Sequence, residues 1–528
     1  MRVLKTVEGL KRYLAQQRGQ TAASGQPPQV GLVPTMGGLH RGHLSLIQRA
    51  QRENEVVVVS MFLNPLQFGP GEDLATYPQT HSQDLHLCAQ AAVDIVFMPT
   101  AQTLYGTSLP VSGNLTQVIP PKDMMAVLCG PYRPGHFEGV ATVVTKLLSL
   151  VAPDRAYFGR KDAQQLAIIK RLSQDLNLPG QLIGCPTIRE PSGLALSSRN
   201  TYLSPVEHQQ AAILHDGLMA AETLFRAGER SSPVLLEAVR QPIAQVPAVD
   251  LQYVELVHPD TLKPLETVTS VGLLALAAHL GTTRLIDNVW LRHRQPIVAI
   301  DGPAGAGKST VARQVAERLN LLYLDSGAMY RAVTWLALEQ GLDLQDEVAL
   351  AELLPDCDLQ LAPSGNDSEF AAYPSRIWLN GREVTALIRS PEVTGQVSVV
   401  AAQPAVRDTL LRQQQQYGIS GGVVMEGRDI GTQVFPQAEL KIFLTASVAE
   451  RARRRQRDLA AQQQPNASLE DLERAIDERD RKDSTRRVAP LRKADDAIEL
   501  NTDGLSIEDV VERIVELFEQ RIPGGLGR

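Results

Sequence analysis

The chain has 528 residues, of which 43% are hydrophobic and 21% are charged, and it carries a net charge of −7. Its length predicts about two to four domains, and its mild acidity argues against bulk nucleic-acid binding, which normally needs a surplus of Lys and Arg. No apolar stretch reaches the roughly 18 residues of a membrane helix, and the longest, Val271–Leu280, is interpreted as a buried strand. The four cysteines lack metal-type spacing, so we expect reduced core thiols in a cytoplasmic protein.

The first half of the chain has the pattern of an α/β domain. Residues 1–17 are expected to form an amphipathic helix without an apolar signal core. Continuous apolar strands separated by helices predict a parallel sheet covered on both faces. We expect the strands at residues 30–33, 56–63, 93–98 and 156–159, with helices such as 43–53 and 139–151 between them. A helical stretch over 207–245, followed by strands at 251–257 and 271–279, predicts a small α+β subdomain.

The second half repeats the alternation of strands and helices. Its buried strands are expected at residues 297–300, 321–324, 423–425 and 440–444. Between the halves lies the short polar run Leu291-Arg-His-Arg-Gln-Pro296, and we place the domain boundary near residue 294. The predicted domains are therefore 1–294 and 295–528, and the first divides into a nucleotide-binding part (about 1–190) and the subdomain (about 191–290).

Two histidines three residues apart follow the first predicted strand, in Pro34-Thr-Met-Gly-Gly-Leu-His-Arg-Gly-His43. At a strand-to-helix turn both would face the helix N-terminus, where free N–H groups and the helix dipole favour phosphate. The alternative is a pair of surface histidines beside a glycine turn. A partner loop is expected at Leu196-Ser-Ser-Arg199, where Arg199 could clamp a phosphate. Lys161 and Asp162 follow a strand, at the sheet edge where α/β proteins bind ligands; the alternative is an exposed ion pair.

These segments, together with residues 62–68, 133–142 and 164–165, resemble the pantothenate synthetase (pantoate–β-alanine ligase) family over about residues 1–290. The resemblance implies a Rossmann-like HxGH nucleotidyl-transferase fold. It also implies a two-step reaction, in which ATP adenylates the pantoate carboxylate with release of pyrophosphate, and β-alanine then displaces AMP to give pantothenate. Homodimerisation through this half is a further implication of the resemblance.

The resemblance also implies roles for individual residues. Gln67 and Gln165 would hold pantoate, with Gln67 near the β-alanine site, and His43 would donate a proton to the departing phosphate. Catalysis would further involve His40, Lys161, Ser197, Ser198 and Arg199. The implied ATP contacts are Met36, Gly37, Gly38, Leu39, His40, Arg41, Gly42, His43, Gly159, Arg160, Lys161, Asp162, Ile188, Leu196, Ser197, Ser198 and Arg199. Arg160 departs from the family, which usually has Glu there, and this changes the local charge balance.

A second nucleotide motif follows the strand at 297–300 and precedes a helical pattern, as a phosphate-binding loop requires. Its backbone N–H groups would cradle ATP phosphates, Lys308 would reach the β and γ oxygens, and Ser309 would bind Mg²⁺. The loop and its first helical turn comprise Gly302, Pro303, Ala304, Gly305, Ala306, Gly307, Lys308, Ser309 and Thr310. This motif indicates a nucleoside triphosphate without specifying a kinase.

The phosphoryl acceptor is indicated by arginines that follow two further strands, in segments 325–331 and 425–429; the alternatives for these segments are a helix cap and a loop ion pair. A charged stretch over 478–487 is interpreted as a lid that stabilises phosphoryl-transfer charge; the alternatives are a solvated helix face or nucleic-acid binding. Together with residues 381–385, 406–407 and 488–491, these segments resemble the cytidylate kinase family over about residues 296–520, whereas adenylate kinase shares only the loop. The resemblance implies CMP or dCMP as acceptor, bound by Ser326, Arg331, Arg407, Arg428, Asp429, Arg479, Asp483 and Arg486. Glu426 stands where that family often has Asp.

As a whole, the sequence resembles a bifunctional fusion of the two families, with two ATP-dependent reactions, Mg²⁺ as cofactor and only small-molecule substrates. We expect neither nucleic-acid nor membrane partners. The alternatives are a non-catalytic nucleotide-sensing fusion protein and, for the first half, an aminoacyl-tRNA synthetase-like protein. Sensors usually lose some of the catalytic residues that are present here, and no basic domain suited to tRNA is evident.

Overall fold

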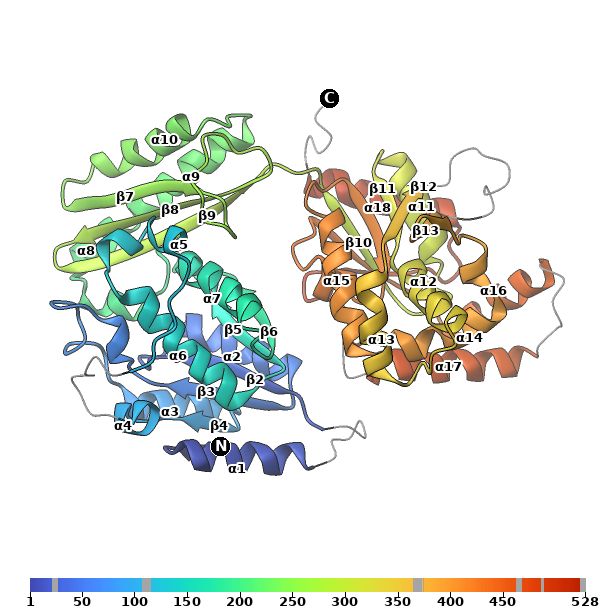
Figure 1. Cartoon of the computed structure of the whole chain (residues 1–528). Coiled ribbons are helices and arrows are strands. Elements are labelled where there is room, and N and C mark those ends of the chain that lie inside the picture. The colour runs from blue at the N-terminus through green and yellow to red at the C-terminus, as the bar shows by residue number, and fades with distance from the viewer. Residues whose placement is uncertain are drawn as a thin grey trace. The chain divides into compact units, whose positions relative to one another are not determined.

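The structure is a computed structural model that describes residues 1–20, 27–106, 115–363, 373, 375–461, 468–485 and 489–522. The chain divides into two compact units, Met1–His293 and Arg294–Arg528 (Figure 1). Each unit is built on a parallel sheet of its own and carries a smaller antiparallel sheet. Among the described residues, no helix is both long and apolar enough to cross a membrane.

The main sheet of the first unit has six parallel strands in the order β1-β4-β3-β2-β5-β6. Along β2, Leu32 packs into the core on one face of the sheet and Val33 into the core on the other, as expected for strands covered on both sides. The predicted strands are confirmed. The six strands are β1 (Arg2–Leu4), β2 (Val30–Thr35), β3 (Val56–Met61), β4 (Ile95–Phe97), β5 (Arg155–Gly159) and β6 (Gln181–Cys185).

Helices cover both faces of this sheet. One face packs against α1 (Val7–Arg18), α6 (His136–Val151) and α7 (Ala163–Asp175), and the other against α2 (Arg41–Glu53) and α3 (His81–Gln90). The connections between these elements contain the short helices α4 (Ala101–Tyr105), α5 (Lys122–Met125), η1 (Pro65–Gln67), η2 (Gly130–Tyr132), η3 (Arg160–Asp162) and η4 (Ser198–Tyr202).

The expected helix over residues 1–17 is wrong at its start, because Arg2–Leu4 forms the edge strand β1. Arg2 pairs with Ile95 of β4, so the first strand precedes the one predicted near residue 30. Helix α1 begins only after Thr6, whose hydroxyl accepts a hydrogen bond from the Gly9 N–H. This cap fixes the helix start, and Arg2–Leu4 pairs with the sheet instead.

The second part of this unit is an antiparallel sheet of β7 (Val249–Val257), β8 (Val271–Leu280) and β9 (Thr283–Arg292). One face packs against α9 (Ile213–Arg226) and α10 (Ser232–Ala244), which follow α8 (Pro205–Ala211) (Figure 1). The other face, including Leu273 and Ala275, packs against Phe137 and Ile168 of the main domain. Because both faces are covered, β8 is almost continuously apolar, which confirms its interpretation as a buried strand.

The main sheet of the second unit is parallel, in the order β11-β15-β10-β16-β17. The strands are β10 (Ile297–Asp301), β11 (Leu322–Asp325), β15 (Val423–Gly427), β16 (Leu440–Thr445) and β17 (Ile498–Asn501). One face packs against α11 (Lys308–Arg318) and α18 (Ile507–Arg521). The carboxyl ends of β10, β11 and β15 are adjacent, so the residues that follow them meet at one edge.

An insertion that the sequence pattern does not reveal lies between β11 and β15. It is an antiparallel sheet of β12 (Leu359–Pro363), β13 (Ser375–Leu379) and β14 (Arg382–Glu383), and its core is shared with nearby helices. The remaining helices of the unit are α12 (Ser326–Glu339), α13 (Glu347–Leu353), η5 (Leu354–Asp356), η6 (Leu387–Arg389), α14 (Pro391–Val400), α15 (Pro404–Tyr417), η7 (Ile430–Val434), α16 (Val448–Ala461) and α17 (Leu469–Thr485).

Candidate active sites

A cavity in the first unit opens at the carboxyl ends of the parallel strands, beside the N-terminus of α2. Most of the predicted ligase residues line it: Met36, His40, Gly42, His43, Gln67, Gly159, Lys161, Asp162, Gln165, Ile188, Leu196, Ser197, Ser198 and Arg199. Five predicted ATP contacts do not line it: Gly37, Gly38, Leu39, Arg41 and Arg160. The sequence therefore identified 14 of the 28 residues that line the cavity.

The turn from β2 to α2 is anchored by a carboxylate that the sequence reasoning missed. Asp84 of α3 is completely buried and accepts hydrogen bonds from the N–H groups of Gly38, at 2.9 Å, and Leu39, at 2.8 Å. Gly37 and Gly38 both have positive φ, of 87° and 62°, a conformation that favours glycine. These residues shape the turn that presents the histidines.

His40 and His43 lie at the start of α2 with ring centroids 4.1 Å apart. The Nδ1 atom of His40 accepts from the Gly42 N–H, and that of His43 accepts from the His40 N–H. In the neutral imidazole an accepting Nδ1 leaves the proton on Nε2, so each ring has an Nε2–H donor. Burial lowers the pKa of His40 to about 4 and that of His43 to about 3, and the charge of Lys161 acts in the same direction. Both imidazoles are therefore neutral donors at pH 7.

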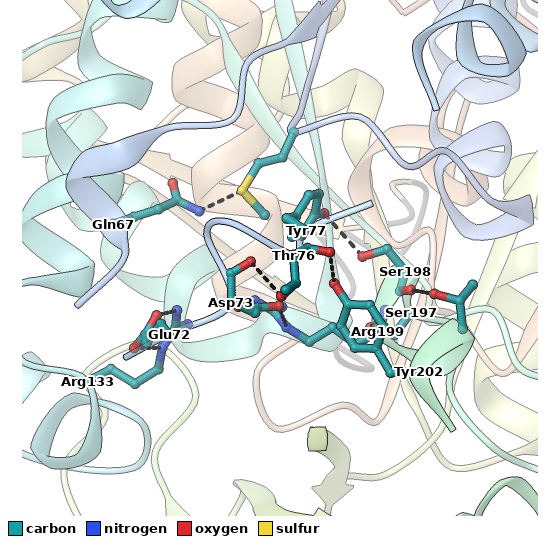
Figure 2. Close-up of polar contacts among 12 residues, drawn as sticks. Gln67, Glu72, Asp73, Thr76, Tyr77, Arg133, Ser197, Ser198, Arg199 and Tyr202 are labelled. Atoms are coloured by element: carbon teal, nitrogen blue, oxygen red, sulfur yellow. Dashed lines mark hydrogen bonds and ion pairs between the residues drawn. The ribbon is translucent and has the colours of Figure 1, made fainter. Parts of the chain in front are cut away.

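Gln67 is buried beside the cavity, and its side chain is oriented by its neighbours. Its Oε1 accepts from Asn64 Nδ2 at 3.1 Å, and its Nε2 donates to the Met36 sulfur (Figure 2). Asn64 is itself fixed by the Tyr105 hydroxyl, which donates to Asn64 Oδ1 at 2.7 Å. The amide of Gln67 is therefore held at the cavity wall by packing and hydrogen bonds.

Arg199 is paired with a carboxylate of the segment between η1 and α3. Its Nε and Nη2 donate to the two oxygens of Asp73, each at 2.8 Å. In the same segment Tyr77 shares a hydrogen bond with Ser198, and Glu72 accepts two from Arg133 (Figure 2). A phosphate that took the Nε and Nη2 donors of Arg199 would have to displace Asp73, a contact that the position of Arg199 in the sequence did not indicate.

The turn that carries Lys161 is fastened to the small sheet. Asn288 of β9 donates from Nδ2 to the carbonyl oxygens of Arg160, at 3.1 Å, and of Lys161, at 2.9 Å. The Arg160 side chain packs over the ring of Trp290, and burial lowers the pKa of its guanidinium. The signal for Asn288 in the sequence is its position: with Asp287 it interrupts the apolar run from Leu285 to Leu291.

In the second unit, the phosphate loop connects β10 to α11. Gly302, Gly305 and Gly307 have positive φ, and a Cβ at Gly302 would lie 2.1 Å from the Leu444 carbonyl oxygen. Lys308 is the first residue of α11, is buried, and donates from Nζ to the Pro303 carbonyl oxygen at 2.7 Å. Burial and the charge of Arg428 lower the pKa of this lysine. The ammonium group of Lys308 is therefore held by a carbonyl oxygen of its own loop, and an anionic phosphate would be a stronger partner for this buried charge.

Beside this loop lies a buried cluster around Glu426, the last but one residue of β15. The Tyr323 hydroxyl donates to Glu426 Oε1 at 2.5 Å, and the Ser309 side chain is hydrogen-bonded to the same carboxyl. Burial and the charge of Asp325 raise the pKa of Glu426. The Ser309 hydroxyl and this carboxylate are hard oxygen donors of the kind that suits Mg²⁺.

Several of the predicted acceptor residues form hydrogen bonds or ion pairs with one another or with the ends of the strands. Ser326 Oγ donates to the Glu426 carbonyl oxygen, and Arg407 pairs with Asp429. Arg428 pairs with Asp483 at 2.9 Å, and burial lowers the pKa of Arg479 beside Arg428. Arg486 lies outside the described residues.

Two further residues at this edge were missed by the sequence reasoning. Asp325 accepts from Arg331 at 2.6 Å. Arg389 donates to the Thr385 carbonyl oxygen, while its buried Nη2 has no hydrogen-bond partner in the described part of the chain. Burial and the charge of Arg331 lower the pKa of Arg389. Positive charge that is incompletely neutralised in this way is suited to a phosphate monoester.

Comparisons with known proteins agree with this division. The family model "Pantoate-beta-alanine ligase" matches residues 2–290, and "Cytidylate kinase" matches residues 298–520. A "Bifunctional pantoate ligase/cytidylate kinase" of Trichormus variabilis is 58% identical and covers 99% of this chain and 99% of its own length. One from Synechococcus elongatus is 54% identical, over 100% of this chain and 97% of its own.

The chain belongs to the bifunctional pantoate ligase/cytidylate kinase family. It is an enzyme of two ATP-using families, so the non-catalytic nucleotide-sensing alternative is wrong. The crystal structure of pantothenate synthetase from Thermus thermophilus has 42% sequence identity and a TM-score of 0.50, and it matches 55% of this chain and 99% of its own. The first unit therefore has the fold expected for a pantothenate synthetase, and all four cysteines of the chain are free and buried, as predicted.

Proposed function

We propose that the unit Met1–His293 condenses pantoate with β-alanine and that the unit Arg294–Arg528 phosphorylates CMP or dCMP, each at the expense of ATP. In the first reaction, a pantoate carboxylate oxygen attacks the α-phosphorus of ATP and pyrophosphate leaves. The β-alanine amine then attacks the acyl carbonyl, and AMP leaves with formation of the amide. In the second reaction, the acceptor phosphate attacks the γ-phosphorus and ADP leaves.

The ligase proposal depends above all on the adjacent imidazoles of His40 and His43, whose rings are tilted by 37° relative to each other. Two neutral imidazoles with Nε2–H donors at a helix N-terminus would stabilise the charge that develops on the α-phosphate. Lys161 would neutralise phosphate charge in the same cavity, and Gln67 and Gln165 would orient pantoate. A neutral His43 donates a hydrogen bond from Nε2–H without first acquiring a proton, so we assign it stabilisation of the transition-state charge. Because transfer of the proton itself would require the imidazolium, which burial disfavours, we do not assign it the proton-donor role that the family resemblance implies.

The kinase proposal depends on the phosphate loop together with the arginines that face it. Lys308 would leave the Pro303 carbonyl for the β and γ oxygens of ATP, and Arg331, Arg428 and Arg479 would stabilise the transferred group. Ser309 and Glu426 would hold Mg²⁺. The ion supplies charge neutralisation of the ATP phosphates when it is bound.

The choice of base would be made by Asp429, because a carboxylate accepts from the N4–H₂ donor of cytosine and repels the O4 of uracil. Arg407 pairs with Asp429 and holds the carboxylate in place. Comparison of the kcat/KM values for CMP, dCMP and UMP tests this role. We expect UMP to be the poorest of the three in the wild-type chain, and Asp429→Asn to reduce the preference for CMP.

Two variants of the full chain test whether the sites are independent. His43→Ala should abolish pantothenate formation and retain CMP phosphorylation, whereas Lys308→Ala should do the reverse. Loss of both activities in either variant, in a chain that remains folded, would contradict the proposal.

We further propose that the enzyme is a cytoplasmic homodimer that associates through its first unit. Free buried thiols are consistent with a reducing compartment. Sedimentation equilibrium of the full chain and of a chain limited to residues 295–528 provides the test. The proposal requires a dimer for the first and a monomer for the second.

A further inference from the structure

Asp301 ends β10 and directly precedes Gly302, the first residue of the phosphate loop. Its side chain is only 4% exposed, and both carboxylate oxygens accept backbone hydrogen bonds. Oδ1 accepts from the Ile430 N–H at 2.8 Å, and Oδ2 accepts from the Gly431 N–H at 2.7 Å. Asp301, at the end of the strand that leads into the phosphate loop, therefore holds the segment that follows β15.

The two amides belong to the first turn of η7, immediately after Arg428 and Asp429. The first N–H groups of a helical turn have no partner within the turn, and Asp429 makes no side-chain cap here. Because these groups are buried, an unsatisfied N–H would be costly, and Asp301 supplies the acceptors from another strand. The position of the turn, and of the two residues before it, is thus set by β10.

The contact is close as well as polar. In the sheet Asp301 lies beside Gly427, the residue before Arg428. A Cβ at Gly431 would lie 3.2 Å from Asp301 Oδ2 and 3.2 Å from Lys441 Cδ, so the turn has little room to move. Closely packed segments of this kind transmit a displacement at one end to the other.

We propose that Asp301 is a positioning residue for the nucleoside monophosphate site, which fixes Arg428 and Asp429 relative to the phosphate loop. This inference rests on the acceptor-binding roles proposed above for Arg428 and Asp429. Asp301 acts through the backbone of Ile430 and Gly431 and does not itself touch a nucleotide. Asp301, at the carboxyl end of the central strand, thereby fixes the position of the acceptor site relative to the ATP site.

The type of residue supports this role. A carboxylate has two acceptor oxygens and no donor, so it satisfies two neighbouring N–H groups, whereas an amide has one acceptor and would direct its N–H₂ at the second. The pKa of Asp301 is raised to about 6 by burial, even though the two amides lower it. Burial of this charge is thus costly, and the paired acceptors account for its presence.

Asp301→Asn in the full chain is the test, with Glu439→Gln as matched control. Glu439 accepts from the Ile297 N–H at the other end of β10, at 2.8 Å, so its replacement removes a similar contact far from the acceptor site. We expect Asp301→Asn to raise the KM for CMP about tenfold or more, with a change below about twofold in the KM for ATP. The control should leave both KM values unchanged, and pantothenate formation should be retained in both variants.

Gly431→Ala is a second variant in case Asp301→Asn does not fold. The added methyl group displaces the same turn from Asp301, and it should raise the KM for CMP selectively as well. If the variants lower only the melting temperature, or raise both KM values alike, Asp301 serves general stability and the proposal is overturned. A wild-type chain that fails to phosphorylate CMP would instead overturn the proposed kinase function, so the two failures are distinguishable.

Discussion

The guanidinium of Arg199, which lines the ligase cavity, and the carboxylate of Asp73 form a bidentate ion pair, with both hydrogen bonds at 2.8 Å (Figure 2). Both side chains are about one quarter exposed, so solvent weakens the pair and its net contribution is about 1 kcal/mol or less. A phosphate that took the Nε and Nη2 donors of Arg199 would compete with Asp73. In the ATP site proposed above, the pair would therefore add to the free-energy cost of ATP binding.

Asp73→Asn should tighten ATP binding to the first unit about threefold, because the competing charge is removed. Isothermal titration with ATP, in a chain that also carries Lys308→Ala to disable the second site, measures this change. Glu72→Gln is the control, since it breaks the neighbouring pair with Arg133 and leaves Arg199 untouched. Weaker ATP binding in Asp73→Asn would contradict the prediction and show that Asp73 is needed to shape the site.

The depressed pKa of His43 predicts a pH-dependent stability for the first unit. Because burial lowers this pKa from 6.5 to about 3, the unfolded chain binds a proton between these pH values and the folded chain does not. The free energy of unfolding therefore decreases as the pH falls below 6.5, and His43 alone accounts for a loss of about 2 kcal/mol at pH 5. In calorimetry, the unfolding temperature of His43→Gln should fall less than that of the wild type between pH 8 and pH 5. His81→Gln, at an exposed position, controls for the substitution; parallel curves for His43→Gln and the wild type would refute the assignment.

The sequence predicted those parts of the fold that depend on local patterns. A continuous apolar run predicts a strand that is buried on both faces, as found for Leu32 and Val33, which pack into different cores. The glycines of the phosphate loop likewise predict the positive φ values found there. Motif residues such as His40, His43 and Lys308 carry their chemistry in their type and spacing. For these features one segment contains all the information.

Features that depend on pairing between distant segments could not be predicted. Asp84 and Asp73 are ordinary carboxylates in their own segments, and their partners Gly38 and Arg199 are 46 and 126 residues away. Arg2–Leu4 becomes a strand only because β4 offers an open edge. In each case the deciding contact forms through tertiary packing, which overrides the local preference of the segment.

Asn288→Asp should impair the ligase through the position of Lys161. The amide donates to the carbonyl oxygens of Arg160 and Lys161, and a carboxylate at this place would repel both. We expect kcat/KM for pantothenate formation to fall at least about tenfold, which corresponds to about 1.4 kcal/mol. CMP phosphorylation by the same molecules is the internal control and should be retained. Unchanged ligase kinetics would show that the Lys161 turn is held by other contacts.

Gly302→Ala should abolish CMP phosphorylation and leave pantothenate formation intact. Gly302 has φ of 149°, and a Cβ would lie 2.1 Å from the Leu444 carbonyl oxygen, which is backbone and cannot rotate away. Gly341→Ala is the matched control: it too has positive φ, of 67°, but nothing lies within 4 Å of the added methyl. The control should lose about 1 kcal/mol of stability and keep its kinase activity, because strain without a clash leaves the phosphate loop in place. Assays of both activities on both variants separate the two effects, and an active Gly302→Ala kinase would contradict the loop geometry.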